Sequence, residues 1–65
     1  KMDQVNVAIA DDNERMLELL GNIITSDKDL SLVGKANNGE DVYQIIKTKE
    51  PDVVLLDLIM PKVDG

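Results

Sequence analysis

Short apolar segments alternate with longer segments of helical periodicity, and this alternation limits the folds that the chain can adopt. The apolar segments cover residues 5–10, 30–34 and 53–56, and a helical segment separates each from the next. Such alternation is typical of a parallel sheet, because each helix carries the chain back to the end of the sheet where the next strand starts. The connections are right-handed. The sequence therefore predicts a β-α-β-α-β unit of the α/β class.

Polar and turn residues mark the ends of the two helical segments. Asn13 is a good N-cap for a first helix over residues 14–25, because its side chain can accept hydrogen bonds from the first turn. The turn residues Asn37-Asn38-Gly39 precede a second helix that starts near Glu40. This helix ends before Pro51, which cannot continue a helix.

The first helix carries a wide apolar surface, which predicts cover from more than one neighbour. Met16 is expected in the core. Leu17 and Leu19, at the margins of this surface, are expected to meet a C-terminal helix outside residues 1–65 or to help dock a partner protein. Arg15 and Glu18 then fall on the exposed side of the helix and could tune the choice of partner.

The third apolar segment, residues 53–56, is a continuous run of the kind found in strands buried on both faces of a parallel sheet. The 65 residues hold no later element that could pair with this strand or cover it. We therefore expect residues 1–65 to be the front half of an open sheet. An uncovered apolar edge also favours self-association, so we expect a dimer or a domain swap when nothing else covers it.

Composition excludes several kinds of chemistry. The absence of Cys and His removes disulfides, thiolate nucleophiles, Ser-His-Asp catalysis and imidazole zinc sites. A net charge of −6 argues against direct contact of this chain with nucleic acid or an anionic membrane. No apolar run approaches the ~20 residues of a membrane-spanning helix, and the first residues do not resemble a signal peptide. The expected location is therefore cytoplasmic.

Acidic side chains follow the first and third predicted strands. Asp11 and Asp12 come directly after the first predicted strand, and Asp57 comes directly after the third. Ligands of open parallel sheets bind beyond the carboxyl ends of the strands, so these acids share one edge if the two strands are neighbours. Carboxylates crowded together repel one another unless a cation joins them. Each acid alone fits a plain polar strand end, but together they predict a site for Mg²⁺, or for another hard ion such as Ca²⁺ or Mn²⁺.

Longer motifs surround these acids. Ala10-Asp11-Asp12-Asn13 follows the first strand, and the pattern Asp-x-x-Met-Pro-x-x-Asp-Gly runs from Asp57 to Gly65. Together with Asn37-Asn38-Gly39-Glu40, they resemble the receiver domains of response regulators in two-component signalling. The resemblance covers all 65 residues but about half of a receiver. It implies a flavodoxin-like (CheY-like) doubly wound parallel sheet, with residues 1–65 as its N-terminal half.

The resemblance implies a role for each acid. Asp57 is the expected phosphoacceptor, which attacks a phosphohistidine on a partner protein and becomes an acyl phosphate, as a carboxylate can without a base. The expected Mg²⁺ ligands are Asp57, Asp12, the backbone carbonyl of Ile59, and Asp11 through a metal-bound water. The ion would neutralise charge on the transferring phosphoryl oxygens. The chain is thus expected to be a switch that catalyses only its own phosphoryl transfer, not an enzyme.

The resemblance also implies partners and an output. The phosphoryl donor is expected to be a histidine kinase or a histidine phosphotransferase. Within the family, the sequence is most similar to regulators that initiate sporulation, which implies transcription regulation through a DNA-binding effector domain absent from this chain. The family's Thr or Ser after a fourth strand and its Lys after a fifth lie beyond residue 65, and Lys62 is interpreted as a loop surface residue.

Three other functions fit part of the pattern, and the sequence argues against the first two. A haloacid-dehalogenase-type phosphatase needs a second Asp two residues after the nucleophile, where this chain has Ile59. A dinucleotide-binding half domain needs a glycine-rich first turn, where this chain has Asp11 and Asp12. A degenerate receiver that serves only as a protein-interaction module stays open, although such a module has no need of three acids.

Overall fold

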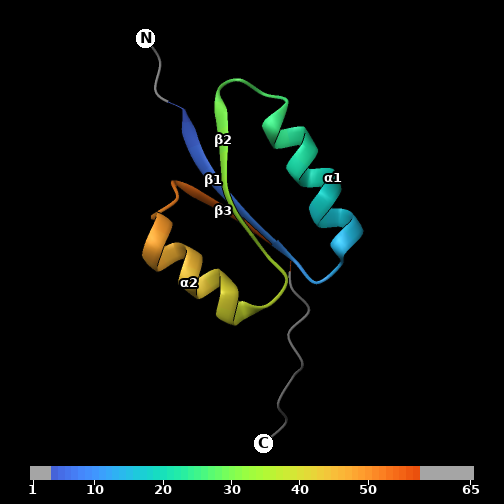
Figure 1. Cartoon of the computed structure of the whole chain (residues 1–65), viewed down its shortest axis with the longest axis vertical. Coiled ribbons are helices and arrows are strands. Elements are labelled where there is room, and N and C mark those ends of the chain that lie inside the picture. The colour runs from blue at the N-terminus through green and yellow to red at the C-terminus, as the bar shows by residue number, and fades with distance from the viewer. Residues whose placement is uncertain (1–3, 58–65) are drawn as a thin grey trace, which may run out of the picture.

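The fold of the chain is a three-stranded sheet with two helices (Figure 1). A computed structural model describes residues 4–57. The elements in chain order are β1 (Val5–Asp11), α1 (Glu14–Thr25), β2 (Leu30–Ala36), α2 (Gly39–Lys49) and β3 (Val53–Asp57). The predicted β-α-β-α-β order is confirmed, and the architecture is that of the front half of a CheY-like fold.

The central strand of the sheet is β1. The strand order is β2-β1-β3, and both pairings are parallel. The first crossover moves the chain to one side of β1 and the second carries it back past β1 to the other side. With right-handed crossovers the two helices must therefore cover opposite faces of the sheet. Alternation along β1 agrees, since Ile9 packs in a cluster with α1 and Ala10 in a cluster with α2.

Each face of the sheet has its own small apolar cluster. On the α1 face, residues of β1 and β2 pack against one side of the helix; the cluster contains Val7, Ile9, Leu17 and Ile24, with Leu20, Leu30 and Leu32 partly buried against it. On the α2 face the cluster contains Ala10, Ala36 and Val42, with Ile45 and Val54 at its margin. Small residues on this second face let α2 lie close to the strands.

The ends of the helices follow from their capping residues. The side-chain oxygen of Asn13 accepts hydrogen bonds from the backbone nitrogens of Arg15 and Met16, at 2.9 and 3.2 Å. The predicted bounds of α1 are confirmed. Helix α2 ends at Lys49 and is followed by the C-cap residue Glu50, whose left-handed backbone, with φ of 48°, turns the chain out of the helix before Pro51.

All three strands run past their predicted ends. β1 and β3 each extend by one residue, to Asp11 and Asp57, and β2 extends by two, to Ala36. The physical reason is pairing across the sheet, because Ala10 pairs with Ala36 and Asp11 pairs with Asp57. A backbone hydrogen-bonded to a neighbouring strand stays extended whatever the polarity of its side chain.

The orientation of α1 corrects two packing predictions. Leu17 lies in the α1 cluster and is only 8% exposed, so it is already covered without a C-terminal helix. Met16, which was expected in the core, is 42% exposed and lies outside it. Leu17 and Ile24 lie two turns apart on one face, whereas Met16, Leu19 and Ile23 share the adjacent face. Leu19 and Ile23 are more than half exposed. Arg15 and Glu18 are exposed, as predicted.

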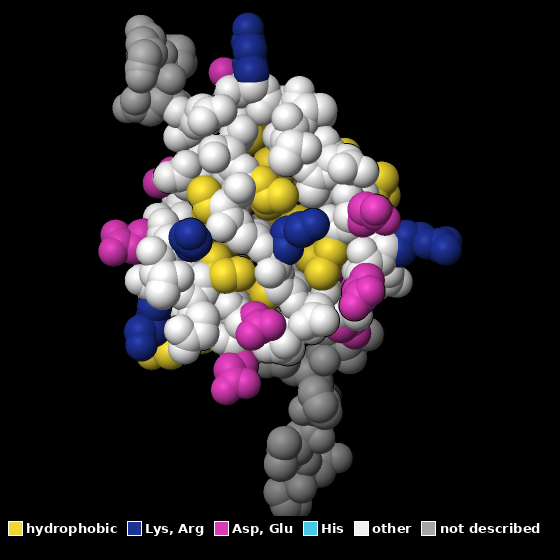
Figure 2. Space-filling view, in the orientation of Figure 1, with side chains coloured by type: hydrophobic (Ala, Val, Ile, Leu, Met, Phe, Trp, Pro, Cys, Tyr) yellow, Lys and Arg dark blue, Asp and Glu magenta, His cyan; other side chains and the backbone are white. Residues whose placement is uncertain are grey.

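Residues 4–57 leave β3 largely uncovered. The exposed fractions of Val53, Leu55 and Leu56 are 42, 45 and 63%. Independently of β3, apolar side chains also lie at the surface between charged ones on the face of the molecule drawn in Figure 2. An apolar strand this exposed is a site for association with another strand or helix. Within residues 4–57, no helix is long and apolar enough to cross a membrane.

We expect a peptide of residues 1–65 alone to self-associate or to be partly unfolded. Ordering each residue costs about 1.5 kcal/mol of conformational entropy, and the exposed apolar side chains of β3 and α1 offset little of it. Sedimentation velocity and thermal melting measure this directly. Leu56→Lys, which places a charge on the open strand, should shift any oligomer towards monomer. A monomeric peptide with one sharp two-state transition would contradict the expectation.

A second prediction concerns the close approach of α2 to β2. A Cβ atom at Gly34 would lie 2.8 Å from Cγ2 of Ile45, whereas one at Gly21 in α1 would meet its nearest neighbour at an ordinary 3.5 Å. Gly34→Ala should therefore destabilise the protein by about 1–3 kcal/mol. Gly21→Ala, the matched control, should stabilise it by up to about 1 kcal/mol through helix propensity. Urea denaturation measures both, and equal effects would refute the tight contact.

Candidate functional site

The carboxyl edge of the sheet brings distant acidic residues together. β1 and β3 are parallel neighbours, and Asp11 at the end of β1 pairs with Asp57 at the end of β3. Paired residues of parallel strands lie about 5 Å apart and point to the same face of the sheet. The condition for the predicted acidic site, that the first and third strands are neighbours, is therefore confirmed. Asp12 follows Asp11 directly, in the turn that leads into α1.

Asp11 differs from the other two acids in its burial. It is 3% exposed, whereas Asp12 and Asp57 are exposed. Its Oδ1 accepts a hydrogen bond from the backbone nitrogen of Asn13 at 2.8 Å. A buried carboxylate needs such partners, because removal from water is costly without them. Within residues 4–57 no buried side-chain polar atom lacks a hydrogen-bond partner.

Hydrogen bonds to the side chains of two residues, Asp11 and Asn13, hold the turn between β1 and α1. Asp11 fixes the backbone of Asn13, and the side chain of Asn13 in turn caps the first turn of α1. Because Asp12 lies between these two residues, its backbone is constrained from both sides. The turn therefore presents the exposed carboxylate of Asp12 from a fixed piece of backbone beside the end of β3.

The carboxylate oxygens at this edge suit a hard cation, but the described side chains do not surround a metal ion on all sides. In the part of the chain that the structure describes, no three acidic side chains lie close enough together to hold a metal ion between them. The predicted ligand Ile59 lies outside the described residues. Mg²⁺ usually takes one or two carboxylates and keeps several waters. The paired strand ends at Asp11 and Asp57 can therefore supply enough carboxylate oxygens without a cluster of three acids.

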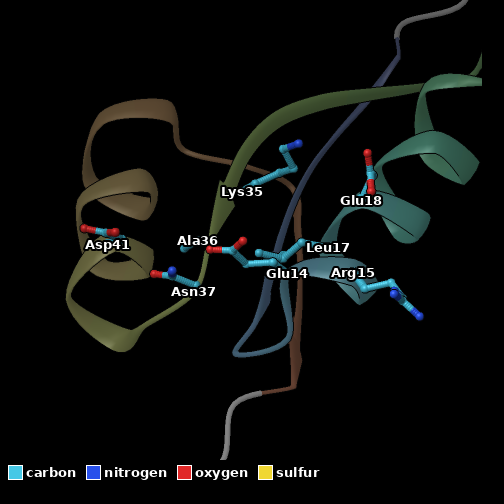
Figure 3. A pocket seen from close by; sticks show the side chains of 8 residues that line it. All are labelled: Glu14, Arg15, Leu17, Glu18, Lys35, Ala36, Asn37 and Asp41. Carbon is cyan, nitrogen blue, oxygen red and sulfur yellow. The ribbon is translucent and has the colours of Figure 1, made fainter.

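An open hollow of about 670 Å³ lies beside the acidic edge, between α1 and the end of β2 (Figure 3). Its lining residues carry both signs of charge and are Glu14, Arg15, Leu17, Glu18, Lys35, Ala36, Asn37 and Asp41. Of these, Arg15 and Glu18 were predicted on the exposed side of α1. Lys35, which reaches the hollow from β2 in Figure 3, has no local sequence signal, because its place depends on the packing of α1 against β2.

We expect the buried carboxyl of Asp11 to support the fold as well as the site. Asp11→Ala removes the acceptor for the Asn13 backbone and should destabilise the protein by about 1–3 kcal/mol. Asp11→Asn keeps a side-chain oxygen at that place and should cost less than about 1 kcal/mol. Urea denaturation in metal-free buffer separates the two variants. Equal losses would show that the hydrogen bond to Asn13 contributes nothing.

Comparison with known proteins gives a consistent result. Residues 7–65 match the family model of the response regulator receiver domain, a range that includes all three acids. A curated relative, the protein-glutamate methylesterase/protein-glutamine glutaminase 1 of Syntrophomonas wolfei, is 41% identical over 64 residues. The match covers 98% of this chain but only 18% of that relative, so the chain spans less than a fifth of its length.

Proposed function

The chain belongs to the response regulator receiver domain family, and we propose that Asp57 is the residue that accepts the phosphoryl group. The observation that carries the proposal is the register of the sheet, which pairs Asp57 with Asp11 at the carboxyl edge. The side chain of Asp57 is exposed and therefore open to a partner protein. A carboxylate can act as a nucleophile without a neighbouring base. This suits a chain that contains no His to serve as that base.

In the proposed reaction, a carboxylate oxygen of Asp57 attacks the phosphorus of a phosphohistidine on a histidine kinase or histidine phosphotransferase. The bond between phosphorus and the imidazole nitrogen breaks, and an acyl phosphate forms on Asp57. Positioning and neutralisation of charge on the phosphoryl oxygens dominate the catalysis of such transfers. The domain would thus act as a switch whose only reaction is its own phosphorylation.

We propose that Asp11, Asp12, Asp57 and the backbone carbonyl of Ile59 together hold Mg²⁺. Asp12 and Asp57, which are exposed, suit direct contact. Asp11 already accepts a hydrogen bond through Oδ1 and suits contact through a water molecule. The same oxygen donors would accept Ca²⁺ or Mn²⁺. When bound, the ion would supply positive charge beside the phosphoryl oxygens.

The proposed partner would dock over the acidic edge and its surroundings. Arg15 and Glu18 are exposed beside this edge and line the hollow next to α1, so they can contribute to the choice of kinase or phosphotransferase. Leu19, which is 52% exposed, remains a candidate for contact with a partner. A receiver that only binds proteins would use the same surface but would not need Asp57.

Two kinds of output are candidates. The sequence resemblance to sporulation-initiating regulators supports transcription control through a DNA-binding effector domain. The name of the Syntrophomonas wolfei relative supports instead an effector that acts on glutamate or glutamine side chains of a protein. In either case this chain would supply the regulatory part. We propose a cytoplasmic location, because phosphorylation by a histidine kinase takes place there.

We also propose that residues 1–65 form the N-terminal half of the receiver. The large exposed fractions of Leu55 and Leu56 support this, because further elements packed beside β3 and over its two faces would cover them. The Thr or Ser and the Lys that receivers use to bind phosphoryl oxygens would then follow the fourth and fifth strands.

Phosphorylation of the full protein with a small-molecule donor tests the assignment of Asp57. In the presence of Mg²⁺ and acetyl phosphate or phosphoramidate, we expect an alkali-labile adduct with the mass of one phosphoryl group. Asp57→Asn should abolish the adduct. Asp52→Asn is the matched control, because Asp52 directly precedes the opposite end of β3 and accepts a hydrogen bond from the backbone nitrogen of Asn6 that an Asn can also accept.

The outcomes separate the competing functions. An adduct that persists in Asp57→Asn would reject Asp57 as the acceptor. An unaltered protein that forms no adduct with either donor would support the protein-interaction module instead. Removal of Mg²⁺ by EDTA should lower the yield of adduct, and an unchanged yield would contradict the proposed metal site.

A further inference from the structure

We propose that the bond between Asn38 and Gly39 is a site of spontaneous deamidation, and that the N-cap of α2 controls its rate. The chain contains five asparagines, and Asn38 alone is followed by glycine. A glycine has no Cβ to shield its backbone nitrogen and moves freely in φ and ψ, so this nitrogen can reach the preceding side-chain amide. Both residues are exposed.

The reaction needs only water as a co-reactant. The backbone nitrogen of Gly39 attacks Cγ of Asn38 and forms a new C–N bond, while the bond from Cγ to Nδ2 breaks. The amide leaves as ammonia and takes up the proton that Gly39 releases, which leaves a cyclic succinimide. Water then opens one of its two carbonyls, so that the product is either aspartate or iso-aspartate. No group is oxidised or reduced.

Three hydrogen bonds hold the Asn38 amide in its capping position. Its Oδ1 accepts from the backbone nitrogen of Asp41 at 2.8 Å, and its Nδ2 donates to Oδ1 of Asn37 at 2.8 Å and to Oδ2 of Asp41 at 3.1 Å. The amide cannot turn towards the nitrogen of Gly39 without breaking these bonds. The reaction therefore proceeds when the first turn of α2 opens, and its rate reports that opening.

Iso-aspartate, one of the two products, is a poorer cap than the asparagine. An aspartate at position 38 keeps an oxygen that can cap the helix, but it has lost both N–H donors and places a second negative charge beside the carboxylate of Asp41, which repels it. Iso-aspartate also adds a methylene to the backbone and shifts the side chain away from the helix. The iso-aspartate product therefore loosens the turn that positions Val42, which packs against Ala10 and Ala36. Deamidation to iso-aspartate would thus weaken the packing of α2 on the sheet.

Peptide mapping after prolonged incubation of the protein near neutral pH tests the proposal. Trypsin cleaves after Lys35 and Lys47 and releases a peptide of residues 36–47. In this peptide we expect the mass change of an amide converted to an acid, located at position 38, and labelling by an isoaspartyl methyltransferase. The other four asparagines should remain unchanged, and the rate at Asn38 should rise several-fold in urea, where the cap is lost.

Substitutions separate the chemistry of the site from the control by the cap. Gly39→Ala should reduce conversion at Asn38 to the level of the other asparagines, and Asn38→Ser should abolish it while keeping a capping oxygen. Asn37→Ala, which removes one tether of the amide, should raise the rate. Absence of conversion at Asn38 even in urea would overturn the site. Equal rates in buffer, in urea and in Asn37→Ala would overturn control by the cap.

Discussion

The parallel pairing of β1 with β3 is the interaction on which the rest of the structure depends. It sets Asp11 opposite Asp57, although most of the chain separates them in the sequence. The same pairing makes β1 the central strand, which forces α1 and α2 onto opposite faces and gives each its own apolar cluster. A shift of one residue in this register would turn Asp57 to the other face of the sheet and separate it from Asp11.

Both helices start at the edge of the sheet that carries the acids, and both are capped by asparagine. Parallel β-α units require this arrangement, because each helix follows the carboxyl end of a strand. The positive end of the α1 dipole therefore lies next to the turn that carries Asp11 and Asp12. The two caps differ in chemistry, since Asn13 precedes Glu14 and Asn38 precedes Gly39. The proposed deamidation therefore applies to the cap of α2 and not to the cap of α1.

Most of the fold could be predicted from local patterns, and the failures have physical causes. Capping residues and Pro51 predicted the ends of the helices to within about one residue, because such signals act within one turn. Strand ends were placed too early, because pairing across the sheet keeps Asp11 and Asp57 extended despite their polarity. The apolar surface of α1 was too wide to show which side faces the sheet, so Leu17 and Met16 were misplaced.

The candidate site could be predicted only in outline. The sequence showed which strand ends carry acids. That these strands are neighbours was a condition that the pairing of β1 with β3 then met. Sequence did not show that Asp11 is buried and engaged with the backbone of Asn13, because that depends on the geometry of the turn. The hollow beside Lys35 requires knowledge of how α1 packs on β2, which no local pattern contains.

The central claim is that the ends of β1 and β3 form one cation-binding edge. Titration of the isotope-labelled protein with Mn²⁺ tests it most directly, because the paramagnetic ion broadens the NMR signals of nearby amides. The account predicts that the amides of Asp11, Asp12 and Asp57 broaden together at low Mn²⁺, while those of Asn6 and Asp52 at the opposite edge stay sharp. Broadening of only one strand end, or equal broadening at both edges, would contradict the account.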